Sequence, residues 1–209
     1  MSTSRLVPRG AGVAADGVEG NARLTSTTGI ILFLLFAAIG ITILSIRRLV
    51  LPHVFIGFLL IPPVALKLGS TGYRFLRYYL RDPRYRVAGP PILELRLLAP
   101  VVVISTIVVF WSGVALWVAG NDSGWLGRSW LTWHKLAFIV WIFATGIHIL
   151  AYLVRAGDLG LADLIGGHRL RGALTRQGLV VAAVVLGVVL AIAMLSLQTP
   201  FLVPSIGDR

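Results

Sequence analysis

Five long apolar stretches follow one another along the chain, separated by shorter polar or arginine-rich segments. The first contains about 18 residues, which form a helix about 27 Å long at roughly 1.5 Å per residue. That length crosses the hydrocarbon core of a bilayer. The pattern therefore predicts an all-α fold, a polytopic membrane helical bundle with five transmembrane helices. The expected spans cover residues 29–46, 51–68, 97–119, 130–154 and 179–197.

The segments around the spans are interpreted from their composition. The N-terminal segment is small, polar and glycine-rich, so we predict a disordered tail. Inside the second span, Pro62-Pro63 predicts a kink, which serves either packing alone or a bend that makes room for a flat cofactor. The expected segments are a tail at 1–27, a bundle at 28–198 that includes a basic loop at 69–96 and a linker at 155–177, and a C-terminal tail at 199–209.

The distribution of positive charge predicts the orientation of the bundle. With the N-terminus in the cytoplasm, the inside segments carry fourteen Lys and Arg residues and the outside segments carry five. Cytoplasmic loops are enriched in these residues, so we expect the N-terminus inside and the C-terminus outside. The pair Arg47-Arg48 is the exception, because it falls on the outer side.

Composition narrows the class of protein further. Hydrophobic residues make up 57% of the chain and charged residues only 13%, whereas a soluble domain has about 25% charged residues. The net charge of +11 comes from arginines beside the spans, where tyrosines interleave with them. This pattern favours contact with anionic head groups over nucleic acid. We expect a multi-pass protein of the bacterial plasma membrane, with the lipid bilayer as a partner and no nucleic acid.

The chain contains no cysteine, and its apolar stretches contain no acidic residue; each absence argues against a class of function. The chain has no cysteine, which excludes disulfides, Cys-ligated iron–sulfur clusters and covalently attached c-type haem. The acidic residues all lie outside the apolar stretches. Proton pumps and ion-coupled transporters usually keep a carboxylate at membrane depth, so this distribution weighs against a transporter.

Two of the spans share a pattern of nitrogen-bearing side chains. In the second span, His53 is followed fourteen positions later by Lys67, and in the fourth, His134 is followed at the same spacing by His148. Fourteen residues are nearly four helical turns, so each pair shares a helix face at a separation of about 21 Å. The two spans have the same direction. We therefore expect a His/His pair near the outer membrane face and a Lys/His pair near the inner face.

The surroundings of the outer pair suit a flat cofactor that contains a metal. An imidazole in hydrocarbon is costly without a partner, and iron supplies one. Gly57, one turn below His53, leaves room for a macrocycle. A zinc site is the weaker alternative, because no Cys, Asp or Glu lies nearby to complete it. The facing side of the fourth span carries Ala137, Trp141, Ala144 and Thr145.

Arginine and lysine side chains at the two ends of these spans are expected to neutralise cofactor propionates. At the outer site the candidates are Arg47, Arg48, Arg128 and Lys135. At the inner site they are Arg74, Arg77 and Arg155. His168 lies on the expected linker, and we interpret it as unrelated to the site.

Two spans in the same direction, each with ligands at this spacing, resemble the transmembrane b-type cytochromes. These include the di-haem cytochrome b of quinol-oxidising complexes, the cytochrome b subunits of hydrogenases and formate dehydrogenases, and ferric-reductase-like proteins. The resemblance covers the second and fourth spans, under a quarter of the chain. It implies one or two non-covalent b haems, with His53 and His134 as iron ligands of the outer haem and His148 as a ligand of the inner one.

Lys67 departs from the family pattern, because it stands where a fourth histidine is expected. Three outcomes are open. Lys67 ligates the inner iron as a neutral amine, which requires a strongly lowered pKa. Alternatively, an inner haem is five-coordinate on His148. In the third outcome there is no inner haem, and Lys67 extends to the cytoplasmic interface.

The expected function is electron transfer to or from a quinone, a redox partner protein or another subunit. The chain has no nucleotide, flavin or molybdenum motif, so we interpret it as an electron carrier or the membrane subunit of an oxidoreductase rather than a complete enzyme. The alternative is a non-redox anchor or assembly subunit in which the histidines only pack.

Overall fold

The computed structural model describes residues 9–86, 93–165 and 172–197. Within them, five helices are long and apolar enough to cross a membrane. This confirms the predicted all-α polytopic bundle. Its elements are α1 (Arg9–Ile43), α2 (Ile46–Tyr79), α3 (Pro83–Arg86), α4 (Leu93–Ala119), β1 (Gly124–Trp125), β2 (Arg128–Ser129), α5 (Trp130–Ile165) and α6 (Ala173–Leu195).

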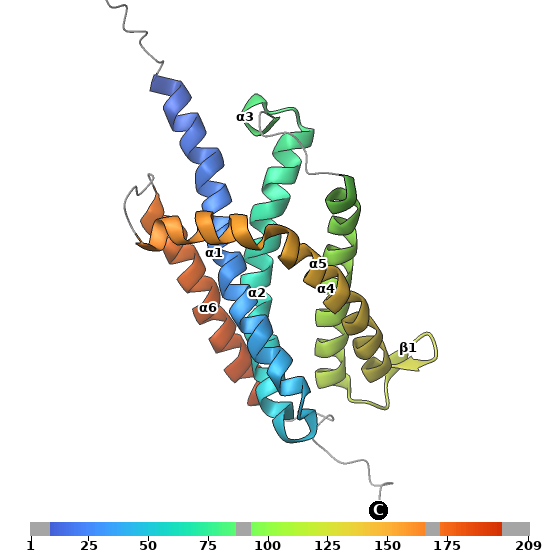
Figure 1. Ribbon diagram of the computed structural model, residues 1–209. Helices are drawn as coiled ribbons and strands as arrows, with labels where there is room; N and C mark the ends of the chain where they lie inside the picture. Colours follow the sequence, from blue (N-terminus) through green and yellow to red (C-terminus); the bar gives the residue numbers. More distant parts are fainter. Residues whose placement is uncertain (1–8, 87–92, 166–171, 198–209) are drawn as a thin grey trace, which may run out of the picture.

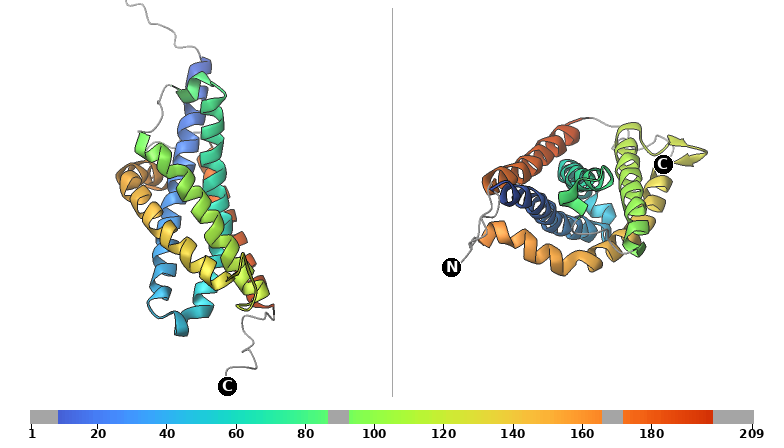
Figure 2. Two further views of the ribbon diagram at one scale, coloured as in Figure 1. Left: turned by 90° about the vertical axis from the view of Figure 1, so that its right-hand side faces the viewer. Right: turned by 90° about the horizontal axis from the view of Figure 1, so that it is seen from above.

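The five long helices alternate in direction, as consecutive spans must. Figure 1 shows α2 and α5 running one way and α1, α4 and α6 the other. α2 packs against α1 and α6, whereas α5 packs against α4 and α1. α5 starts beside α4 and crosses the bundle obliquely, so that its second half lies over α1 (Figures 1 and 2). The short antiparallel pair of β1 and β2 closes the turn between α4 and α5.

α2 and α6 approach each other closely at Gly187. A Cβ atom added to Gly187 would lie 2.2 Å from the carbonyl oxygen of Leu59, and Ala191, one turn further along α6, is fully buried. Small residues four positions apart let helix backbones meet in this way within membranes. Trp117 of α4 closes the same contact, because its Nε1 donates to the carbonyl of Met194 at 3.1 Å.

The sequence predicts a kink at Pro62-Pro63. The backbone of α2 keeps helical dihedral angles there, and the residue with non-helical dihedral angles inside α2 is Leu49. A proline removes the N–H that would bond to the carbonyl four residues earlier, which for Pro63 is the carbonyl of Leu59. That carbonyl is the one that Gly187 of α6 approaches. The carbonyl that loses its helical donor at Pro63 therefore faces α6.

The predicted disordered tail is wrong from Arg9 onward, because α1 begins there. Polar side chains of this part of α1 bond to α2. Asn21 Nδ2 donates to the carbonyl of Ser70 at 3.1 Å, and Thr25 Oγ1 donates to Ser70 Oγ at 2.9 Å. Asn21 and Thr25 therefore hold α1 against α2 through polar side chains that water would solvate in a disordered tail.

The predicted basic loop at 69–96 and linker at 155–177 are also partly helical. α2 continues to Tyr79, and α5 continues to Ile165. The added residues of α5 are rich in Leu and Ala and contain no proline, and the helix continues through Gly157 and Gly160. α2 ends before Arg81, whose positive φ of 63° turns the chain into α3.

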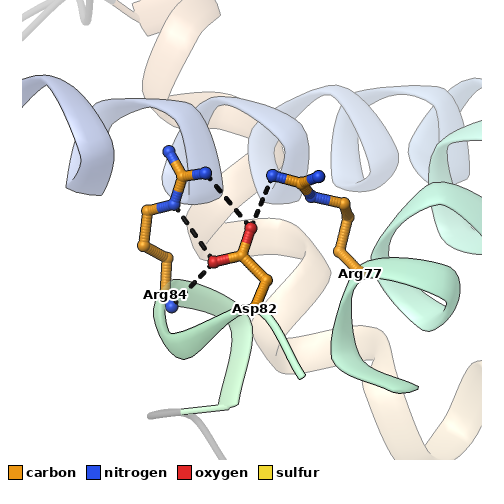
Figure 3. A network of polar contacts seen from close by, with 3 residues as sticks. All are labelled: Arg77, Asp82 and Arg84. Carbon is orange, nitrogen blue, oxygen red and sulfur yellow. Dashed lines mark hydrogen bonds and ion pairs between the residues drawn. The ribbon is translucent and has the colours of Figure 1, made fainter. Parts of the chain in front are cut away.

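A single carboxylate organises the turn between α2 and α3 (Figure 3). Asp82 accepts from Arg77 at 2.6 Å, from the Arg84 guanidinium at 3.1 and 3.2 Å, and from the Arg84 backbone N–H at 3.0 Å. The hydrogen bonds from the Arg84 side chain, helped by its backbone N–H and by the charge of Arg77, lower the pKa of the Asp82 carboxyl.

This lowered pKa predicts an acid-sensitive turn. The ionised carboxylate stabilises the fold at any pH above its unfolded pKa of about 3.9. The contribution is lost as the pH falls through the lower pKa of the folded state. The protection of the α3 amides, measured as their hydrogen-exchange rate relative to that of the unfolded chain at the same pH, should therefore be constant above about pH 4 and fall below it. In Asp82→Asn this fall with acid should disappear; an unchanged profile in that variant would contradict the assignment.

Candidate metal centre

The histidines at the start of α2 and α5 face each other. The ring centroids of His53 and His134 lie 6.3 Å apart, with the ring planes at 89°. A metal bound to one nitrogen of each ring at about 2.0–2.1 Å would place the centroids roughly 6 Å apart. The expected meeting of these two side chains at one depth is thus what the structure contains, and the spacing fits one metal ion between them.

Each ring is held through its Nδ1 atom. His134 Nδ1 lies 3.0 Å from the carbonyl of Val109 on α4, which only accepts, so this nitrogen carries the proton. His53 Nδ1 lies 2.8 Å from Thr42 Oγ1. The Thr42 hydroxyl donates to the carbonyl of Ile39, so it accepts from His53. Both Nε2 atoms keep their lone pairs, which is the tautomer that metal-binding histidines adopt.

An apolar cavity surrounds the two rings. Its volume is about 200 Å³, which is smaller than the roughly 300–1,000 Å³ of typical cofactor sites, so a bound macrocycle would extend beyond it. The two histidines are the titratable side chains among its lining residues. Gly57 lines it as predicted, and so does Trp141. Other walls come from α1, α2, α4 and α5, through Phe36, Ile39, Val54, Phe58, Phe110, Val114 and Phe138.

The predicted wall of α5 is buried along its length. Ala137, Trp141, Ala144 and Thr145 are each at most 8% exposed. Trp141 Nε1 donates to Thr106 Oγ1 of α4 at 3.1 Å, and its ring meets Phe36 of α1 at a centroid distance of 4.8 Å. These contacts fix the cavity wall between three helices.

Three contributors to this site lie outside the histidine pattern: Thr42, the Val109 carbonyl and Gly113. Thr42 had a detectable signal, because it is a polar residue in an apolar stretch, close to the turn that leads to His53. Gly113 of α4 lies against the His134 ring. A Cβ atom there would be 3.1 Å from Cε1 and 3.3 Å from Nδ1 of His134.

The Gly113 contact predicts a selective effect of a single methyl group. Gly113→Ala should shift the His134 ring by a few tenths of an ångström and lower the affinity for a metal cofactor, by about 10-fold or more. Gly40→Ala is the matched control, because nothing lies within 4 Å of its added Cβ. Cofactor titration of both variants measures the effect, and equal affinities would contradict the role of Gly113.

The basic side chains that we expect to pair with propionates at the outer site are exposed. Arg47 and Arg48 lie on the first turn of α2, at the same end of the bundle as His53, and both are exposed, as are Arg128 and Lys135. Their pairing with propionates stays a prediction.

The inner pair is arranged differently from the outer pair. Lys67 Nζ donates to the backbone carbonyl of Thr25 on α1 at 2.6 Å. His148 is half-buried, and its ring packs against Tyr152 at a centroid distance of 5.0 Å, with the ring planes tilted by 46°. Lys67 Nζ thus has its own protein partner, and it lies close enough to act on His148 electrostatically. Arg74, the expected inner cation, is half-buried and lies within electrostatic reach of Lys67. His168 and the side chain of Arg155 lie outside the described residues.

Two imidazoles are the number of protein ligands that a six-coordinate haem iron takes. A zinc ion takes about four protein ligands or three and water, and the described residues contain no group of three His, Asp or Glu side chains placed to hold one. A porphyrin brings four nitrogens of its own and needs only axial ligands. Comparisons with protein families, with curated proteins and with solved structures found no match for this chain.

Proposed function

We propose that the protein is a membrane-integral b-type cytochrome that carries electrons through haem bound between His53 and His134. The observation that carries the proposal is the pair of rings 6.3 Å apart in an apolar cavity. Both rings are anchored at Nδ1, which leaves both Nε2 atoms to bind iron. Two glycines support the proposal. Gly57 lines the cavity without filling it, and Gly113 lets the His134 ring lie against α4.

The residues of this chain divide the work of such a site. When bound, haem supplies a reversible one-electron change at its iron. His53 and His134 would hold the iron of such a haem through their Nε2 atoms. Thr42 and the Val109 carbonyl hold the rings in position. The apolar walls keep water from the metal and thereby influence its potential.

A carrier of this kind exchanges electrons with other molecules. In a bilayer the candidates are a quinone and a redox protein or subunit docked at the membrane surface. Two histidines on one iron would leave it no position for a substrate, and the sequence contains no Gly-x-Gly-x-x-Gly motif for a dinucleotide. The other half-reaction therefore belongs to a separate protein, with this chain as the membrane partner.

Colour tests the proposal directly. Protein purified from haem-replete cells should show a Soret band and an α-band that change between the reduced and oxidised states. Colourless protein from such cells would overturn the proposal and leave the non-redox anchor or assembly subunit.

The hydroxyl of Thr42 should affect cofactor affinity although it touches no metal. Thr42→Val keeps the shape of the side chain but removes the acceptor for His53 Nδ1, which leaves this N–H unpaired in an apolar site. Loss of such a partner costs about 10- to 100-fold in metal affinity. Thr42→Ser keeps the hydroxyl and should behave like the natural protein. Haem titration measures both, and similar losses in the two variants would show that Thr42 acts through packing.

A further inference from the structure

We infer that the chain binds a single haem, at the end of the bundle remote from the α2–α3 turn, and that Lys67 bridges α1 and α2 where a second ligand pair would otherwise form. This inference rests on the proposed function and specifies the number and position of its redox centres. The evidence is the contrast between the outer and inner pairs of nitrogens, which have the same spacing in the sequence but different partners in the structure.

Lys67 is engaged with α1. Its Nζ donates to the Thr25 carbonyl at 2.6 Å, and it passes through the gap that Gly29 leaves, since a Cβ atom on Gly29 would lie 2.9 Å from Nζ. The contact continues into Ser70, which accepts from Thr25 Oγ1 at 2.9 Å and donates to the Lys67 carbonyl at 3.0 Å. To ligate iron, Lys67 would have to lose its proton and leave this network.

The helix arrangement separates the inner pair. α1 packs along both α2 and α5. Seen from above, α1 lies between α2 and the second half of α5 (Figure 2). At the other end the His53 and His134 side chains extend from α2 and α5 and meet at a ring-centroid distance of 6.3 Å. The oblique course of α5 is thus the reason why equal spacings in the sequence produce one facing pair instead of two.

One centre at one depth restricts where electrons enter and leave. The inner nitrogens lie about 21 Å along their helices from the outer pair, so a single outer haem leaves the inner half of the bundle without a redox group. The positive-charge distribution puts that inner half at the cytoplasmic side. The protein would therefore pass electrons between partners at the outer face, rather than across the bilayer.

Haem stoichiometry per chain tests the count. The natural protein should bind one haem, and Lys67→Met and His148→Ala should each still bind one with an unchanged low-spin spectrum. Two haems in the natural protein would overturn the inference. Loss of haem from either variant would also overturn it, provided that the variant still elutes as a folded, monodisperse species. The count in the natural protein stands even if a variant misfolds. Absence of haem from the natural protein would instead overturn the proposed function.

Access of a membrane-impermeant oxidant tests the position. Ferricyanide added to right-side-out vesicles that contain the reduced natural protein should oxidise all of the haem at once. The same addition to inverted vesicles should leave it reduced. Rapid oxidation in both preparations, or in the inverted vesicles alone, would overturn the single outer centre.

Discussion

Replacing either His53 or His134 by alanine is expected to remove the haem signal completely. With the rings 6.3 Å apart, each supplies one side of the coordination, and neither variant keeps a second imidazole within reach of the metal. The remaining histidine would be left in an apolar cavity with a vacant coordination position opposite. The low-spin spectrum should therefore disappear in both variants, and haem per chain should fall from about one to near zero.

His148→Ala is the matched control for this experiment, because it makes the same substitution further along α5. The His148 ring of the natural protein packs against Tyr152 and lies outside the cavity lining. The haem spectrum of His148→Ala should therefore survive. The measurement is absorbance after reduction, with haem quantified against protein in monodisperse samples. A full low-spin spectrum in either His53→Ala or His134→Ala would show that the pairing is wrong.

The second large effect concerns stability. Gly187→Ala should destabilise the bundle, because the added Cβ would lie 2.2 Å from the Leu59 carbonyl oxygen and 3.0 Å from its carbon. These are backbone atoms, so the clash is relieved only if α6 moves away from α2. Overpacking of this kind costs about 1–3 kcal/mol and sometimes more. The displaced contact would also loosen Trp117, whose Nε1 bonds to the carbonyl of Met194 on α6.

Gly178→Ala makes the same change on the same helix where nothing lies within 4 Å of the added Cβ. Alanine is favoured over glycine in a helix by about 1 kcal/mol, so this control should be neutral or stabilising. Thermal unfolding in detergent, followed by loss of helical signal or by aggregation, compares the two. Equal midpoints for both variants would contradict the close approach of α2 and α6.

The spans and the meeting of the outer histidines were predictable because they depend on local properties. Span length follows from the number of consecutive apolar residues, and the shared face of His53 and Lys67 follows from helical periodicity. The depth of His53 and His134 follows from alternating direction. The roles of these residues toward iron stay predictions, since they rest on the cofactor.

The helix ends and the second partners of the histidines were not predictable from the same patterns. In the part of α1 predicted as a tail, Asn21 and Thr25 bond to Ser70, which lies 45 or more positions away in the sequence. Gly113 matters only because α4 places it behind the His134 ring. Likewise, the fate of Lys67 depends on Gly29 and Thr25 of another helix. Such properties arise from packing, which periodicity does not encode.

Two of the bonds that tie α1 to α2 have a consequence for the order of biogenesis. One joins Thr42 to His53 and the other joins Lys67 to Thr25, so both lie within the hairpin of α1 and α2. This hairpin leaves the ribosome before α5, with the partner of His53 Nδ1 already present. His134 follows about eighty residues later. Cofactor capture would then be a late event of maturation, and nascent chains stalled before α5 should insert into the membrane but remain colourless.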